Sequence, residues 1–176
     1  MENSDLIDLS DYAWQRLIGR LDGMEDAEYL WEPAPGSWSI RPGADGAWRL
    51  DGAVPAPDPA PLTTIAWRLH HIADGVLAAE RNATWLGLAI AAPVVGAPAA
   101  TVAEVRPRLE ASYSFWRQCL DGAGDLSAPV GPVAGHYADA TRRSFVLHEL
   151  DELIHHSAEV ALLLDLYRAA PSITRR

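Results

Sequence analysis

Residues 142–169 read RRSFVLHELDELIHHSAEVALLLDLYRA, and this stretch decides the fold. Its apolar side chains recur mostly at spacings of three and four residues, as one face of an α-helix requires. They are Val146, Leu150, Leu153, Ile154, Ala161 and Leu164. Pro171 follows the end of the pattern, where a helix is expected to stop. The stretch therefore predicts one long helix over 142–169.

Three further stretches, near residues 5–30, 62–87 and 101–121, show the same periodicity. Within the first, a separate short turn is expected over Asp26–Trp31. Four helices of about 20 residues, with hardly any strand signal, predict an all-α fold of the four-helix-bundle type.

Local signals mark the ends of these helices. Thr63 or Thr64 is the expected N-cap of the second helix, because a threonine hydroxyl can accept a free amide of the first turn. Thr101 and Glu104 match a capping box at the start of the third. Pro107 lies inside that helix and predicts a kink or a later start.

Residues 32–61 differ from the rest of the chain, because they contain seven of the 13 prolines. This density rules out a long helix. The stretch also contains Trp38 and Trp48, and tryptophans in loops are seldom left in solvent. It is predicted to be a long Pro/Trp-rich loop folded over the bundle between the first two helices. Residues 88–100 and 122–141 are expected to be shorter connections.

Composition limits the classes of function. The chain has 176 residues, 49% of them hydrophobic, which fits a single domain spanning 1–176 with its own core. A net charge of −10, with arginine as the only basic residue besides histidine, argues against nucleic-acid and anionic-membrane binding. The lone Cys119, the acidic N-terminus and the lack of a long apolar run favour a cytoplasmic protein.

The helix over 142–169 also carries side chains that bind metals. Glu152 and His156 are four residues apart and therefore meet on one helix face. His148, His155 and Glu159 fall with them in a sector of about 100°, away from the centre of the apolar stripe. Two such ligands, with one from a neighbouring helix, leave an open coordination position. The alternative is that these residues form an ordinary solvated face.

The second helix offers two candidates for the third ligand, His70 and His71, which point about 100° apart. Asp74 is placed to accept a hydrogen bond from the other ring nitrogen of either histidine. The pattern alone leaves the choice between them open.

Residues 63–72 (TTIAWRLHHI) and 152–160 (ELIHHSAEV) resemble the second-helix and fourth-helix signatures of the DinB-like (DinB/YfiT) superfamily. Residues 30–33 (LWEP) and 36–42 (GSWSIRP) resemble the loop after the first helix in actinobacterial members. The resemblance covers roughly residues 10–170. It implies a four-helix bundle with a metal triad in a cleft.

The usual triad of that family is one histidine from the second helix and two histidines, four residues apart, from the fourth. Here Glu152 stands at the first of the paired positions, as glutamate does in some members, including the mycothiol-dependent maleylpyruvate isomerases. The second-helix histidine of the family precedes an apolar residue, here Ile72. The resemblance therefore implies the ligands His71, Glu152 and His156, with zinc as the preferred ion and nickel or iron(II) as alternatives.

The same resemblance favours a thiol-dependent enzyme. A low-molecular-weight thiol of the mycothiol or bacillithiol type would attack a small electrophile, with His148 or Glu159 moving a proton. Two alternatives remain: a metal-dependent hydrolase of small molecules, and a non-catalytic metal-binding or interaction bundle. A homodimer formed through tryptophan-rich surface belongs to the last of these.

Overall fold

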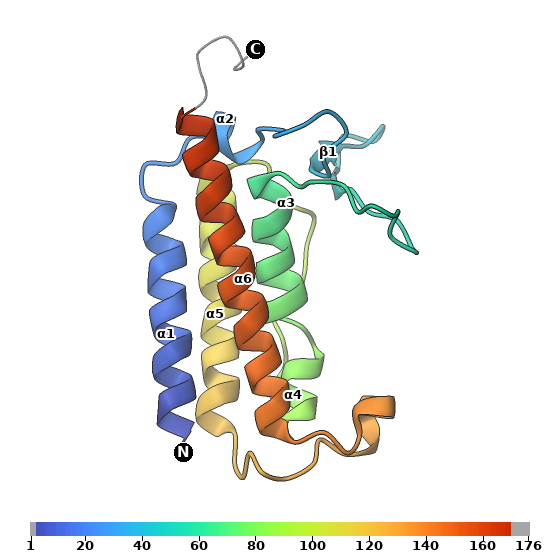
Figure 1. Cartoon of the computed structure of the whole chain (residues 1–176). Helices are drawn as coiled ribbons and strands as arrows, with labels where there is room; N and C mark the ends of the chain where they lie inside the picture. The colour runs from blue at the N-terminus through green and yellow to red at the C-terminus, as the bar shows by residue number, and fades with distance from the viewer. Residues whose placement is uncertain (1–2, 170–176) are drawn as a thin grey trace.

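The computed structural model describes residues 3–169 and is a bundle of four helical rods (Figure 1). The first rod packs against the third and fourth, and the second packs against the same two. In chain order the rods are α1 (Asn3–Arg20), α3 (Ile65–His70) continued by η1 (His71–Leu77), α5 (Val102–Gly122) and α6 (Arg142–Ala169). The predicted all-α four-helix bundle is confirmed.

Helix α6 has the predicted bounds. Its core stripe is fully buried and consists of Val146, Leu150, Leu153, Val160 and Leu164. Ile154, expected in this stripe, is instead 38% exposed. It follows Leu153 directly, and a step of about 100° around the helix turns it away from the core.

The first predicted helix is shorter than expected. Helix α1 ends at Arg20, and α2 (Asp26–Tyr29) forms the separate turn that the sequence indicated. Gly23 lies between them with a φ of 72°, in the left-handed region that favours glycine. The chain therefore leaves the helix before it begins the short turn.

The second predicted helix, over 62–87, is divided into three parts. Thr64 is its N-cap, and its hydroxyl accepts a backbone amide of the first turn. After α3 the chain continues as the π-helix η1, in which the amide of Ala78 bonds the carbonyl of Ala73 at 2.9 Å. A break then precedes α4 (Arg81–Trp85). The wider turn of a π-helix, which often occurs at functional sites, lies inside this rod.

The third predicted helix runs through Pro107 without interruption. The hydroxyl of Thr101 accepts the amide of Glu104 at 3.3 Å, as a capping box requires. The Glu104 carboxylate, however, accepts the amide of Ala100 at 2.8 Å and not that of Thr101. The reciprocal half of the predicted box is therefore displaced by one residue.

Only part of the Pro-rich segment packs on the bundle. Ser37, Ser39 and Ile40 are buried, whereas residues 52–60 are exposed and project from the bundle (Figure 1), and the segment contains an unpredicted hairpin. Strands β1 (Ile40–Pro42) and β2 (Trp48–Leu50) pair antiparallel. The backbone of Trp38 bonds that of Leu62 and that of Thr64, both at 2.8 Å. These bonds fasten the hairpin to the start of α3, at one end of the bundle (Figure 1).

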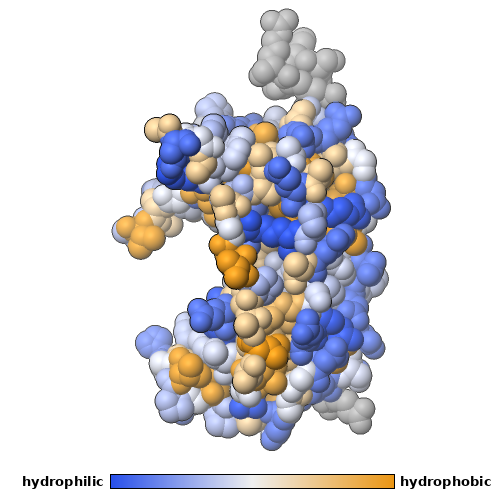
Figure 2. Space-filling view, turned by 180° about the vertical axis from the view of Figure 1, so that it is seen from behind, coloured by the Kyte–Doolittle hydropathy of each residue, from blue (hydrophilic) through white to orange (hydrophobic). Residues whose placement is uncertain are grey.

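The 122–141 connection contains the short 3-10 helix η2 (Pro132–Tyr137), which also projects from the bundle. It lies near the other end, beside α4 and the first turns of α6 (Figure 1). Between the two projections the surface is hollowed and partly hydrophobic, as the view from behind shows (Figure 2). Within residues 3–169, no helix is long and apolar enough to cross a membrane.

Two polar side chains on the second rod fasten it to its neighbours. Buried His70 accepts the amide of Ala99 on Nε2 at 2.9 Å, and its Nδ1 lies 3.6 Å from Oδ2 of Asp74. Asp74 accepts two hydrogen bonds from Arg108 of α5, both at 2.8 Å. His70 and Asp74 therefore have structural partners of their own.

We expect Asp74→Asn to lower the free energy of unfolding at neutral pH by about 1–3 kcal/mol, because Arg108 loses a charged partner. Burial alone would raise the pKa of Asp74, but the hydrogen bonds from His70 and Arg108 outweigh it and hold that pKa below its usual range. A carboxyl with a depressed folded pKa stabilises above its unfolded pKa, and this stabilisation disappears as the pH falls through the folded value.

Urea denaturation of both proteins across the acidic range measures this difference. The wild-type and Asp74→Asn free energies should converge at low pH. Asp45→Asn, which removes an exposed partner of Arg49, is the matched control and should change stability by less than about 0.5 kcal/mol. Equal stability of Asp74→Asn and wild type at pH 7 would contradict the assignment.

Candidate metal centre

Three side chains from two rods converge on the face between η1 and α6. One ligand atom of each of His71, Glu152 and His156 lies within 4.8 Å of the others. Oε2 of Glu152 is 3.7 Å from Nε2 of His71 and 3.1 Å from Nε2 of His156. The structure therefore brings together the three residues that the sequence singled out.

The convergence follows from the two helices that carry the residues. Glu152 and His156 are one turn apart on α6, so their side chains lie one above the other. His71 stands where α3 passes into η1, and the helix curls so that Gly75 faces its ring. A Cβ at position 75 would lie 3.1 Å from Nδ1 of His71, which is tighter than ordinary contact. Glycine therefore lets this ring pack against the π-helix backbone.

His156 is held by carboxylates at both ring nitrogens. Its Nδ1 lies 2.7 Å from Oε2 of Glu159, so we assign the Nδ1 proton to a hydrogen bond donated to that carboxylate. Nε2 then carries the lone pair that faces Glu152. Arg68 lies over the same carboxylate, with Nε 2.8 Å from Oε2 of Glu159 in an ion pair that is not aligned as a hydrogen bond. Arg68 thus balances the charge of Glu159.

Aromatic rings hold His71 from the other side. The Trp67 indole stacks on the His71 imidazole, with centroids 5.4 Å apart and 17° between the planes. Trp38 packs on Trp67 at 5.7 Å, and Nε1 of Trp67 donates to the carbonyl of Asp51 at 2.7 Å. The Pro-rich segment therefore supports the site through this tryptophan pair.

The electrostatics suit cation binding. Burial, with smaller contributions from His156 and Arg68, lowers the pKa of His71, which keeps its imidazole neutral and able to donate a lone pair. Burial alone would raise the pKa of Glu152, but the neighbouring histidines outweigh it and lower that pKa. A neutral nitrogen and an ionised oxygen are the forms that bind metal.

The spacing fits a divalent ion of the zinc type. With bonds of about 2.0–2.2 Å, two ligand atoms of a tetrahedral site lie roughly 3.4 Å apart. The distances of 3.1 and 3.7 Å from the carboxylate oxygen to the two imidazole nitrogens lie on either side of this value. Two of the three ligand spacings therefore suit the ion, and the third, between the two imidazole nitrogens, is within 4.8 Å.

A second group of ligand-type side chains, His155, His156 and Glu159, overlaps the first. It would use Nδ1 of His156 and the Glu159 oxygen that is already paired with Arg68. His155 is also exposed, with 56% of its side chain accessible. We call His71, Glu152 and His156 the inner group and His155, His156 and Glu159 the outer group. An ion bound by the inner group leaves the His156–Glu159 and Glu159–Arg68 pairs intact, so we favour the inner group.

The remaining sequence candidates are placed as follows. Of the two pairings left open for Asp74, the structure has the one with His70, whose Nδ1 lies 3.6 Å from Oδ2 of Asp74, and not the one with His71. His148 is exposed one turn before Glu152, and Glu159 contacts His156.

Three further residues of the site, Arg68, Trp67 and Gly75, were not among the candidates predicted from the sequence. All three lie three or four residues from His71, a spacing that could have indicated them.

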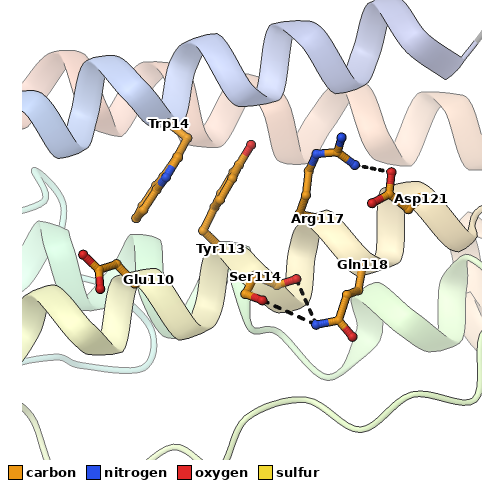
Figure 3. Close-up of a pocket in the computed structure, with 7 residues that line it drawn as sticks. All are labelled: Trp14, Glu110, Tyr113, Ser114, Arg117, Gln118 and Asp121. Atoms are coloured by element: carbon orange, nitrogen blue, oxygen red, sulfur yellow. Dashed lines mark hydrogen bonds and ion pairs between the residues drawn. The ribbon is translucent and has the colours of Figure 1, made fainter.

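A separate groove lies on the far side of the site's helices, over α5 and α1 (Figure 3). The stacked rings of Trp14 and Tyr113 form one wall, and Arg117 pairs there with Asp121. The groove contains none of the metal-ligand candidates and is open to solvent.

Comparison with known proteins identifies the family of this chain. The family model of the DinB superfamily matches residues 10–160, which include all three candidate ligands. No curated protein and no solved structure shows significant similarity to the chain. Because the match covers most of the sequence, the chain belongs to the DinB superfamily.

Proposed function

We propose that this protein is a metal-dependent enzyme that activates a low-molecular-weight thiol for transfer to a small electrophile. The observation that carries the proposal is the convergence of His71, Glu152 and His156, with His156 held from behind by Glu159. A carboxylate behind a ligating histidine is the usual support of protein metal sites.

The donor set indicates which ion is used and what it contributes. Two imidazole nitrogens and one carboxylate oxygen suit zinc, with nickel or iron(II) as alternatives. A bound divalent ion lowers the pKa of a thiol or water that occupies its open position. Because Arg68 balances Glu159, only Glu152 opposes the charge of the ion, and the site keeps a net charge of about +1.

The residues around the site prepare the thiol for attack. Glu159 keeps the proton of His156 on Nδ1, so that Nε2 faces the reaction centre. His148, one turn from Glu152 and exposed, is the proposed acceptor of the thiol proton. The sulfur then bonds to the electrophilic carbon, and the leaving group departs with its bonding electrons. The contacts of Glu159 favour a positioning role for that residue.

The choice of a thiol over water rests on resemblance. Glu152 stands where the mycothiol-dependent maleylpyruvate isomerases also have glutamate. A hydrolase would use the same ligands with water as nucleophile, and the assay below separates the two.

We expect purified wild type to contain close to one equivalent of divalent metal, and His71→Ala, Glu152→Ala and His156→Ala to lose most of it. Each substitution removes one of three protein ligands, and a site with only two protein ligands binds the ion weakly. Elemental analysis after dialysis measures the content.

His155→Ala is the matched control for metal content, because this exposed neighbour belongs only to the outer group. It should keep its metal. Full retention in all three ligand variants would refute the inner site, and loss of metal in His155→Ala would transfer the assignment to the outer group.

We expect Glu159→Gln to weaken metal affinity by about 10–100-fold without abolishing it, since the amide holds His156 less strongly than the carboxylate. Competition with a chromophoric chelator measures the dissociation constant. An affinity equal to wild type would show that Glu159 does not support His156.

We expect metal-loaded protein to consume a chloronitrobenzene in the presence of a thiol, with release of chloride, and His156→Ala to lose at least about 100-fold in rate, because the activating ion is gone. Consumption that is independent of thiol would favour the hydrolase. Absence of both reactions across several electrophiles, in protein shown to contain metal, would favour a non-catalytic bundle.

A further inference from the structure

Side chains of α4 close the open end of the π-helix η1. The last carbonyls of a helix have no partners within it, so they need donors from elsewhere. Nδ2 of the buried Asn82 donates to the carbonyls of Val76 and Leu77, at 2.7 and 3.1 Å. Nη2 of Arg81 donates to the carbonyl of Gly75 at 3.2 Å. The first two residues of α4 therefore hold the end of η1 in place.

Arg81 also connects this end of η1 to α6. Its Nε and Nη2 both donate to Oε1 of Glu149, at 3.2 and 2.8 Å. The Glu149 side chain is only 1% exposed, and its Oε2 is buried without a hydrogen-bond partner among the described residues. A buried ion pair adds little to stability compared with apolar side chains of similar size, because taking charges out of water is costly. This favours a role for the pair in fixing the position of η1.

The position of η1 decides where the His71 ring lies. Gly75 follows His71 by one turn, and a Cβ at position 75 would lie 3.1 Å from Nδ1 of the ring. Nε2 of the same ring is 3.7 Å from Oε2 of Glu152. Glu152 follows Glu149 by three residues on α6. One segment of α6 therefore faces His71 directly through Glu152 and is linked to it a second time through Glu149, Arg81 and Gly75.

We propose that Arg81 and Glu149 are positioning residues of the candidate metal centre. By holding the Gly75 carbonyl, the pair fixes η1 against α6 in the position where Nε2 of His71 faces Glu152. The ligands are then in place before an ion binds, so that little binding free energy is lost in ordering η1. The inference rests on the proposed function for its metal, but not for the packing of the metal-free chain.

A double variant separates positioning from stability. Arg81→Met alone leaves the buried Glu149 carboxylate unpaired and should lower the urea midpoint of unfolding. Adding Glu149→Leu removes this charge, so the midpoint should return close to that of wild type, with the net charge of the chain unchanged. The zinc affinity should stay about tenfold weaker than wild type, since the Gly75 carbonyl has lost its donor. Competition with a chromophoric chelator measures this affinity.

Two single variants accompany the double variant. Arg81→Lys keeps a charged donor beside Glu149 but loses the planar fork that also reaches Gly75, so its zinc affinity should lie between those of the double variant and wild type. Arg106→Met is the matched control, because this guanidinium pairs with Asp22 and Glu110 on other parts of the bundle. It should leave zinc affinity unchanged.

The metal-free chain gives a second readout. A Cβ at position 75 would lie 3.4 Å from Cε1 of His71, so an α proton of Gly75 is close to the ring proton on that carbon. EDTA-treated wild type should show a nuclear Overhauser effect between these two protons, and the double variant should show a weaker one.

Wild-type zinc affinity in the folded double variant would overturn the inference, and so would an unchanged Overhauser effect. A wild type that binds no zinc would refute the proposed function. The comparison of metal-free proteins would then still decide whether the pair positions His71.

Discussion

The site depends on the orientation of the His156 ring, whose two nitrogens both face carboxylates of its own helix. Its Nε2 lies 3.1 Å from Glu152 and its Nδ1 lies 2.7 Å from Glu159. The spacings of four and three residues place all three side chains on one face of α6. Moving any of them by one position would turn it about 100° away from this face.

The second rod must bring His71 to this face, and the rest of the fold makes that possible. His70 and Asp74 hold the rod from behind through Ala99 and Arg108. On the open side, Trp67 stacks on His71 and is itself held by the Pro-rich segment. The loop between the first two helices is therefore part of the support of the candidate metal centre.

The π-helix η1 links the candidate ligands to α4. Gly75 in this element contacts the His71 ring, and its carbonyl accepts from Arg81, which also pairs with Glu149. Changes in the position of η1 would thus affect His71 and the Arg81–Glu149 pair together.

The sequence by itself determined α6 and the Glu152–His156 pair. Helical periodicity is a local property, so one segment of the sequence is enough to show it. Periodicity did not distinguish His70 from His71, whose directions differ by one helical step. The resemblance to the family selected His71, and the packing of the rod, including its π-helical turn, turns His71 toward α6. The contacts of Arg68 and Asp74 were equally undetermined, since each depends on which helix lies opposite. Side chains that pair within a helix follow from spacing along the chain, whereas pairs between helices exist only once the bundle has packed.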